Sequence, residues 1–72
     1  MLDPMKTIEV IVNGRKSATA ARTLAELIDE HAFSDVKVAT ALNGHFVAEP
    51  RRATTELEAG DRVEIVSARQ GG

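Results

Sequence analysis

Apolar and polar residues alternate near the start of the chain, which is typical of a strand with one buried side. Residues 6–12 place three aliphatic side chains on one side of an extended backbone and Ile11 on the other. The pair Asn13-Gly14 follows, and both residues tolerate the positive φ angles of a two-residue hairpin turn. A weaker strand of small residues at 15–20 returns from this turn. We therefore expect a hairpin whose second strand lies at the edge of a sheet.

The apolar residues then change to a helical spacing. Thr23 is followed three residues later by Glu26, and this pair is typical of a capping box at a helix start. A short helix is predicted over residues 24–32, with one apolar stripe facing the core. The stripe is formed by Leu24, Leu27, Ile28 and His31.

A second hairpin is predicted after the helix. Residues 36–42 alternate again, and they place Ala39 and Ala41 on the side opposite the larger side chains. Asn43-Gly44 repeats the hairpin signal, and residues 45–47 form the short return strand.

The connection to the last strand is expected to be irregular. Residues 50–52, Pro-Arg-Arg, are interpreted as a solvated loop. Residues 54–57 predict a turn or a single 3₁₀ turn that brings Leu57 into the core. Gly60 supplies the positive φ of a tight turn, and residues 62–66 form the final strand.

This order of elements predicts an α+β fold of two layers, because a single helix can cover only one face of a sheet. Two hairpins joined through one helix, followed by a last strand, indicate a ubiquitin-like β-grasp with a mixed four- to five-stranded sheet. We expect the first and last strands to form a parallel central pair. The face without a helix would then carry a candidate partner interface. Its residues are Ile11, Ala39, Ala41 and Val66.

The polar end of the chain is the candidate reactive segment. We expect residues 1–5 to be a disordered leader, with Met5 an alternative start, residues 6–66 the folded domain, and residues 67–72 a flexible tail. A terminal carboxylate has a pKa of about 3.5, so it is ionised at neutral pH and can attack an activated phosphate. Gly71 and Gly72 have no Cβ, so they suit a narrow channel in a partner. The alternative is an ordinary frayed end.

The amino-acid composition argues against several classes of function. The chain has 72 residues, a net charge of −2, no Cys, Trp or Tyr, and two Phe. Such a surface does not predict nucleic-acid binding, and no apolar run approaches the ~20 residues of a membrane span. Without cysteine the chain forms no disulfide and carries no persulfide of its own. We expect a cytoplasmic protein that is monomeric when free and binds no metal or cofactor.

Two histidines, His31 and His45, are the remaining candidates for side-chain chemistry. His31 falls in the last turn of the predicted helix, and His45 falls beside the second hairpin turn. Neither is accompanied by a nucleophile or a cluster of metal ligands, so we expect structural or surface roles for both.

Taken together, these segments resemble the ThiS family of sulfur carriers in thiazole (thiamine) biosynthesis. The matching segments are residues 8–14, 23–27, 41–47, 54–66 and 68–72. Leu42-Asn43-Gly44, the Gly60-Asp61 turn and the Gly-Gly end are specific as a set, although none is specific alone.

The resemblance implies a carrier that is not itself an enzyme. An E1-like adenylyltransferase of the ThiF type would use ATP and Mg²⁺ to adenylate the Gly72 carboxylate. Sulfur from a persulfide donor would then give a Gly72 thiocarboxylate, which thiazole synthase of the ThiG type would accept. Arg69, Gln70 and Gly71 would thread into the active sites of these partners.

Two other interpretations stay open at this point. The chain could be a related carrier that serves molybdopterin or cysteine synthesis, with the same body and another acceptor. It could instead be a ubiquitin-like modifier or interaction module without sulfur chemistry. A modifier would be found in an isopeptide bond to partner lysines, and a plain interaction domain would tolerate the loss of Gly72.

Overall fold

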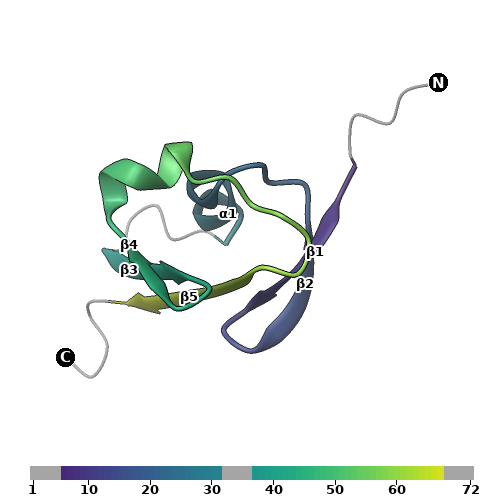
Figure 1. Ribbon diagram of the computed structural model, residues 1–72, viewed down its shortest axis with the longest axis horizontal. Helices are drawn as coiled ribbons and strands as arrows, with labels where there is room; N and C mark the ends of the chain where they lie inside the picture. Colours follow the sequence, from purple (N-terminus) through teal and green to yellow (C-terminus); the bar gives the residue numbers. More distant parts are fainter. Residues whose placement is uncertain (1–5, 32–36, 68–72) are drawn as a thin grey trace.

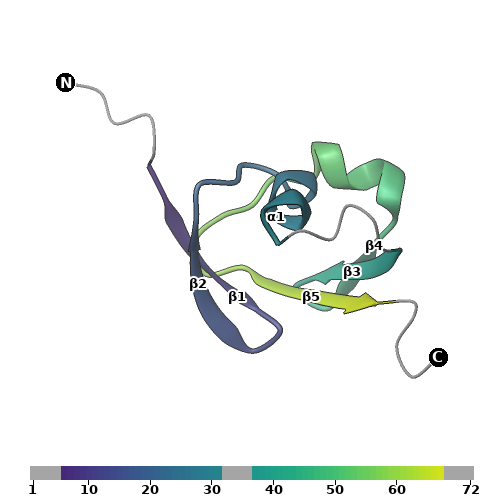
Figure 2. The same cartoon turned by 180° about the vertical axis from the view of Figure 1, so that it is seen from behind.

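The computed structural model describes residues 6–31 and 37–67, which form one five-stranded sheet with its helices on one side (Figures 1 and 2). In chain order the elements are β1 (Ile8–Val12), β2 (Arg15–Thr19), α1 (Leu24–Glu30), β3 (Val38–Leu42), β4 (His45–Val47), the 3₁₀ helix η1 (Glu49–Thr54) and β5 (Arg62–Ser67). The predicted α+β class and the ubiquitin-like β-grasp fold are confirmed, with five strands in the sheet.

The last strand lies in the middle of the sheet. The strand order is β2-β1-β5-β3-β4, so β5 has β1 on one side and β3 on the other. The β1–β5 pair is parallel, as predicted, and aligns Ile11 with Arg62 and Val12 with Val63. β3 runs antiparallel to β5 over five residue pairs. The strand that leads into the C-terminal segment is therefore held from both sides.

Both predicted hairpin turns are present. Asn13 and Asn43 have a φ of 51°, and the glycines that follow them have φ values of 85° and 86°. Two successive residues with positive φ make the tight turn whose twist matches that of the strands. The predicted turn at Gly60 is confirmed as well, with a φ of 89°.

The core lies between the sheet and α1. The buried apolar side chains are Val10, Val12, Ala21, Leu24, Leu27, Ile28, Leu57, Val63 and Ile65. They include three of the four residues of the predicted helical stripe and the predicted plug Leu57. At α1, the Thr23 hydroxyl accepts from the N–H of Glu26 at 3.2 Å, whereas the Glu26 carboxylate accepts from the N–H of Arg22. The cap therefore reaches one residue further back than the standard capping box.

His31 departs from the prediction, because it is exposed rather than part of the apolar stripe. α1 ends at Glu30, and His31 is its C-cap. Its ring Nδ1 lies 3.0 Å from the carbonyl oxygen of Leu27. Since that carbonyl can only accept, Nδ1 carries the hydrogen in this contact. His31 thus has a capping role, and residue 32, the predicted helix end, lies outside the described residues.

One residue of the arginine pair, Arg52, differs from the prediction of a solvated loop, whereas Arg51 is exposed. Residues 50–52 belong to η1, and Arg52 is half-buried. Its Nε donates to the Thr40 hydroxyl at 3.0 Å, and its Nη2 donates to the Val38 carbonyl at 2.7 Å. Arg52 therefore fastens η1 to β3 and satisfies Thr40, a polar residue that is only 2% exposed. The 3₁₀ helix therefore lies earlier in the chain than the turn predicted over residues 54–57, and it shares only Thr54 with that segment.

The boundaries of four strands differ slightly from the prediction. β1 begins at Ile8 rather than at residue 6, and β2 ends at Thr19 rather than at residue 20. β3 begins at Val38, and residues 32–36 lie outside the described residues, as do the predicted leader 1–5 and residues 68–72. β5 continues through Ser67, one residue beyond the predicted end. Within the two described segments, no helix is long and apolar enough to cross a membrane.

Candidate functional site

The candidate site is the C-terminal end of β5 and the sheet face around it. The predicted reactive residue Gly72 and the threading residues Arg69, Gln70 and Gly71 lie outside the described residues. The structure describes their base, because β5 leads directly into this segment at Ser67. The end of β5 and the beginning of β1 lie at opposite ends of the molecule (Figure 1).

The sheet face opposite α1 brings three of the four predicted interface residues together. Val66 is paired with Ala39, and Ala41 is paired with Glu64, so their side chains share this face. Val66 is 55% exposed and Ala39 is also exposed. Ala39, Ala41 and Val66 are therefore neighbours at the end of the sheet from which the C-terminal segment departs.

Ile11 lies on the same face but apart from that group. It is half-buried and aligned with Arg62, four residues before Val66 on β5. At about 3.3 Å per residue, the two positions are about 13 Å apart along the strand. Arg62 and Glu64 lie between them on this face, so the apolar surface is not continuous from Ile11 to Val66.

Phe46 is an interface candidate that sequence reasoning missed. It is 72% exposed, and its partner across the β3–β4 hairpin is Ala41. It therefore lies on the same face as Ala39, Ala41 and Val66. We call these four residues the apolar patch. The signal was present in the sequence, because a two-residue turn at Asn43-Gly44 fixes the register that places residue 46 opposite residue 41.

Other features of the described residues do not point to a catalytic centre. No group of three or more His, Asp or Glu residues in 6–31 and 37–67 is placed to hold a metal ion. His45 is exposed, as predicted. The predicted interface itself stays a prediction, since no partner chain is present.

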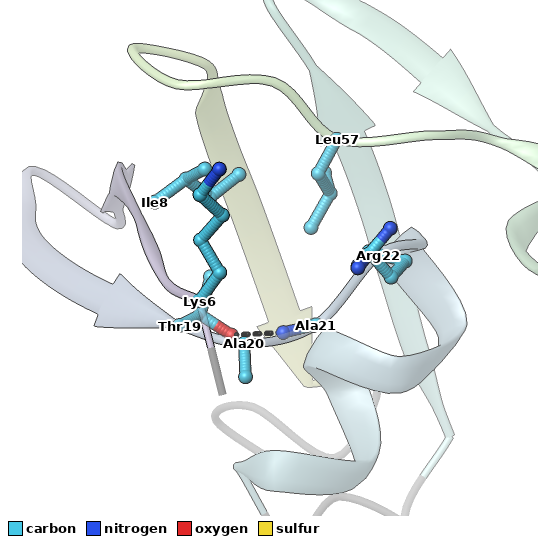
Figure 3. A pocket seen from close by; sticks show the side chains of 7 residues that line it. All are labelled: Lys6, Ile8, Thr19, Ala20, Ala21, Arg22 and Leu57. Atoms are coloured by element: carbon cyan, nitrogen blue, oxygen red, sulfur yellow. Dashed lines mark hydrogen bonds between the residues drawn. The ribbon is translucent and has the colours of Figure 1, made fainter. Parts of the chain in front are cut away.

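A pocket of about 370 Å³ lies at the other end of the sheet. Lys6 and Ile8 line one side, Arg22 and Leu57 the other, and the bond from the Ala21 N–H to the Thr19 hydroxyl closes the floor (Figure 3). The pocket opens beside the beginning of β1, whereas the C-terminal segment leaves from the end of β5, which runs parallel to β1. It is therefore separate from the candidate site.

Comparison with known proteins agrees with this geometry. A thiamine biosynthesis protein (ThiS) from Geobacter metallireducens shares 26% sequence identity with this chain, and its crystal structure superimposes on this one with a TM-score of 0.74. The match covers 90% of this chain and 100% of that one. No curated protein sequence matches the chain. The family model described as "ThiS family" matches residues 6–72, the folded body together with its Gly-Gly end. The chain therefore belongs to the ThiS family.

Proposed function

We propose that this chain is a sulfur carrier for thiazole formation in thiamine biosynthesis, with the Gly72 carboxylate as the group that is charged. The observation that carries the proposal is the family match over residues 6–72, which includes the body and the Gly-Gly end. The thiamine biosynthesis protein from Geobacter metallireducens has the same fold over its whole length. The central position of β5 supports it too, because the strand that precedes the reactive segment is held by neighbours on both sides.

The proposed chemistry takes place on the main chain. A carboxylate oxygen of Gly72 attacks the α-phosphate of ATP in the partner adenylyltransferase, and pyrophosphate leaves. A persulfide sulfur then attacks the acyl carbon, AMP leaves, and a thiol releases the thiocarboxylate by thiol–disulfide exchange. ATP, Mg²⁺ and the persulfide belong to the partners. This chain supplies a narrow, Cβ-free end on a firm base, and it acts as a carrier and not as an enzyme.

We propose the apolar patch as the surface on which these partners dock. Phe46 and Val66 are the two large hydrophobic residues left exposed among the described ones. Both lie on the face without a helix, near the end of the sheet that leads to Gly72. A partner that covers this patch would receive the C-terminal segment beside the contact. Such patches on small soluble domains often mark protein interfaces.

Intact-mass analysis tests the chemistry directly. After incubation with ATP, Mg²⁺, a persulfide donor and a ThiF-type adenylyltransferase, we expect a mass increase equal to one oxygen replaced by sulfur. Fragmentation should place it on Gly72. A reaction without ATP is the control, because adenylation precedes sulfur transfer. No mass change would contradict the proposal and favour the interaction-module alternative. A conjugate in which the Gly72 carboxylate is joined to a lysine of the partner would contradict it and favour the modifier alternative.

Charge placed in the apolar patch should weaken partner binding. We expect Val66→Asp to raise the Kd for the adenylyltransferase at least about tenfold, as truncation or disruption of a contact hot spot does. Ala18→Asp is the matched control, because Ala18 is exposed on the same face but lies on the edge strand β2. Isothermal titration calorimetry measures both affinities, and thermal melting checks that both variants fold. Equal affinities for Val66→Asp and Ala18→Asp would remove the patch from the interface.

A further inference from the structure

Asn13 makes contacts that reach far beyond its turn. The registered pairing of β1 with β5 ends at Val12 and Val63, and the N–H of Asn13 then donates to the Val63 carbonyl at 2.9 Å. Beyond that point, the Asn13 side chain continues the pairing. Its Oδ1 accepts from the N–H of Ile65 at 2.8 Å, and its Nδ2 donates to the Ile65 carbonyl at 3.2 Å. The side-chain amide thus takes the place of a further residue of β1.

This pair of bonds fixes the orientation of the amide. A main-chain N–H can only donate and a main-chain carbonyl can only accept, so the oxygen of Asn13 must face the former and its nitrogen the latter. Ile65 is a buried residue, with 6% of its surface exposed, and buried main-chain groups that are left without a hydrogen-bond partner cost free energy. The contact therefore holds β5 two residues before its end at Ser67.

Asn43 makes a comparable contact at the beginning of the same strand. Its N–H donates to the Arg62 carbonyl at 2.7 Å, and its Oδ1 accepts from the N–H of Arg62 at 2.9 Å. Its Nδ2 donates to the Asp61 carboxylate at 3.0 Å. The asparagines of both hairpin turns therefore hold β5, one near each end. The Asn13 contact is the one beside the C-terminal segment.

We propose that Asn13 is a positioning residue for the reactive C-terminal segment. Its side-chain amide holds the end of β5 against β1, so that the segment after Ser67 starts from a fixed position when it enters a partner. This inference rests on the proposed function, since it requires that a partner activates the Gly72 carboxylate. Without the amide, β5 would lose its hold on the β1 side at Ile65. More backbone would then have to be ordered in each productive encounter with a partner.

The turn and the contact can be separated by mutation. The turn needs a residue that accepts a φ of 51°, whereas the contact needs the side-chain amide. Glycine meets the first requirement and removes the second, so Asn13→Gly deletes the contact with little effect on the turn. Asn13→Asp also tolerates this φ and keeps an oxygen that can accept from the Ile65 N–H, but it loses the donor. Asn43→Gly is the matched control at the other end of β5.

Amide hydrogen exchange on the free protein tests the contact. In Asn13→Gly, we expect exchange at the Ile65 amide to accelerate about 2- to 10-fold relative to the Val10 amide in the core. Dividing by the exchange rate of the Val10 amide corrects for any general loss of stability, which would accelerate exchange at both amides. Asn43→Gly should leave this ratio unchanged, and Asn13→Asp should fall between Asn13→Gly and the wild type. An unchanged ratio of the two exchange rates in Asn13→Gly would overturn the proposal, regardless of whether the protein is a sulfur carrier.

Activation kinetics test the positioning role. With the ThiF-type adenylyltransferase, we expect kcat/KM for Asn13→Gly to fall about 5- to 30-fold, which is the effect of ordering one further backbone residue. Asn43→Gly should stay within about twofold of the wild type at a temperature where both are folded. Faster exchange at Ile65 with unchanged kcat/KM would overturn the proposal while leaving the carrier function intact. If the wild type itself is not adenylated, the proposed function is wrong and the positioning role falls with it, whereas the exchange result still describes the contact.

Discussion

Deletion of Gly72 is expected to lower thiocarboxylate formation at least about 100-fold while leaving the free energy of unfolding unchanged. The deletion moves the reactive carboxylate back by one residue, about 3.3–3.6 Å along an extended chain. A misplacement of about 1 Å at a reacting centre can already reduce the rate about 100-fold. The carboxylate of Gly71 would therefore stop short of the α-phosphate. The stability is unaffected in this proposal, since every residue of the core cluster lies between Ile8 and Ile65.

The experiment compares the truncated chain with two controls of different kinds. Gln70→Ala keeps the length and the glycines, so it should be charged within about tenfold of the wild type. A chain extended by one glycine moves the carboxylate forward by the same distance and should also be charged poorly. Intact-mass analysis measures charging, and urea denaturation measures stability. Normal charging of the truncated chain would contradict the assignment of Gly72, and a large loss of stability would show that the end of the chain contributes to the fold.

Local patterns in the sequence were sufficient for the turns and most elements. Asn13-Gly14 and Asn43-Gly44 supply residues that accept positive φ, and this local requirement decides the turn type. The alternation in 6–12 placed Val10 and Val12 in the core because a strand has a period of two. These predictions succeeded because their cause lies within a few residues of the sequence.

The two errors have different causes, a contact with residues distant along the chain for Arg52 and the position of the helix end for His31. Arg52 was interpreted as solvated because nothing near it suggests a partner, whereas its partners Thr40 and Val38 lie on β3, at least 12 residues away. His31 was assigned to the apolar stripe by spacing alone. The helix ends at Glu30, two residues before its predicted end, and the His31 ring instead caps the Leu27 carbonyl. A tertiary contact thus decides the position of Arg52, whereas the local geometry of the helix end decides that of His31.

The candidate site was predictable to different degrees. Ala39, Ala41 and Val66 were placed on one face correctly, because alternation and strand order determine that result. Phe46 needed one further step, the register of the second hairpin. The second role of Asn13 depends on Ile65, which is 52 residues away, and a turn signal gives no indication of such a contact. The residues of the Gly-Gly end lie outside the described part of the chain, so their role rests on the family match and on the proposed chemistry.

Ile65→Ala is expected to lower the free energy of unfolding by about 2–5 kcal/mol, because it leaves a cavity in a tightly packed core. Ile65 is 6% exposed and belongs to the core cluster. Val66, the next residue on β5, points to the opposite face and is 55% exposed. Val66→Ala leaves no cavity in the core, because Val66 lies outside it. Its expected effect on the free energy of unfolding is therefore below about 0.5 kcal/mol. Adjacent positions on one strand thus differ severalfold in their effect on stability.

Urea denaturation at 25 °C measures both changes in the free energy of unfolding. The small size of the domain limits how large a loss can be measured before the variant no longer folds. Domains of this length have little stability to spare, with totals near the lower end of about 5–15 kcal/mol. If Ile65→Ala does not fold, Ile65→Val gives a smaller expected loss of about 0.5–1.5 kcal/mol and keeps the comparison measurable. Equal losses for the Ile65 and Val66 variants would contradict the assignment of the two faces of β5.

The same strand allows stability and recognition to be separated. Ile65→Val should lower the free energy of unfolding and leave the Kd for the adenylyltransferase unchanged when the folded fraction is taken into account. Val66→Asp should do the reverse, because its side chain lies on the exposed face beside Ala39 and away from the core. Only a strand with one face in the core and the other available to a partner gives this reciprocal pattern. A parallel loss of stability and affinity in both variants would instead mean that partners recognise the integrity of the fold and not the apolar patch.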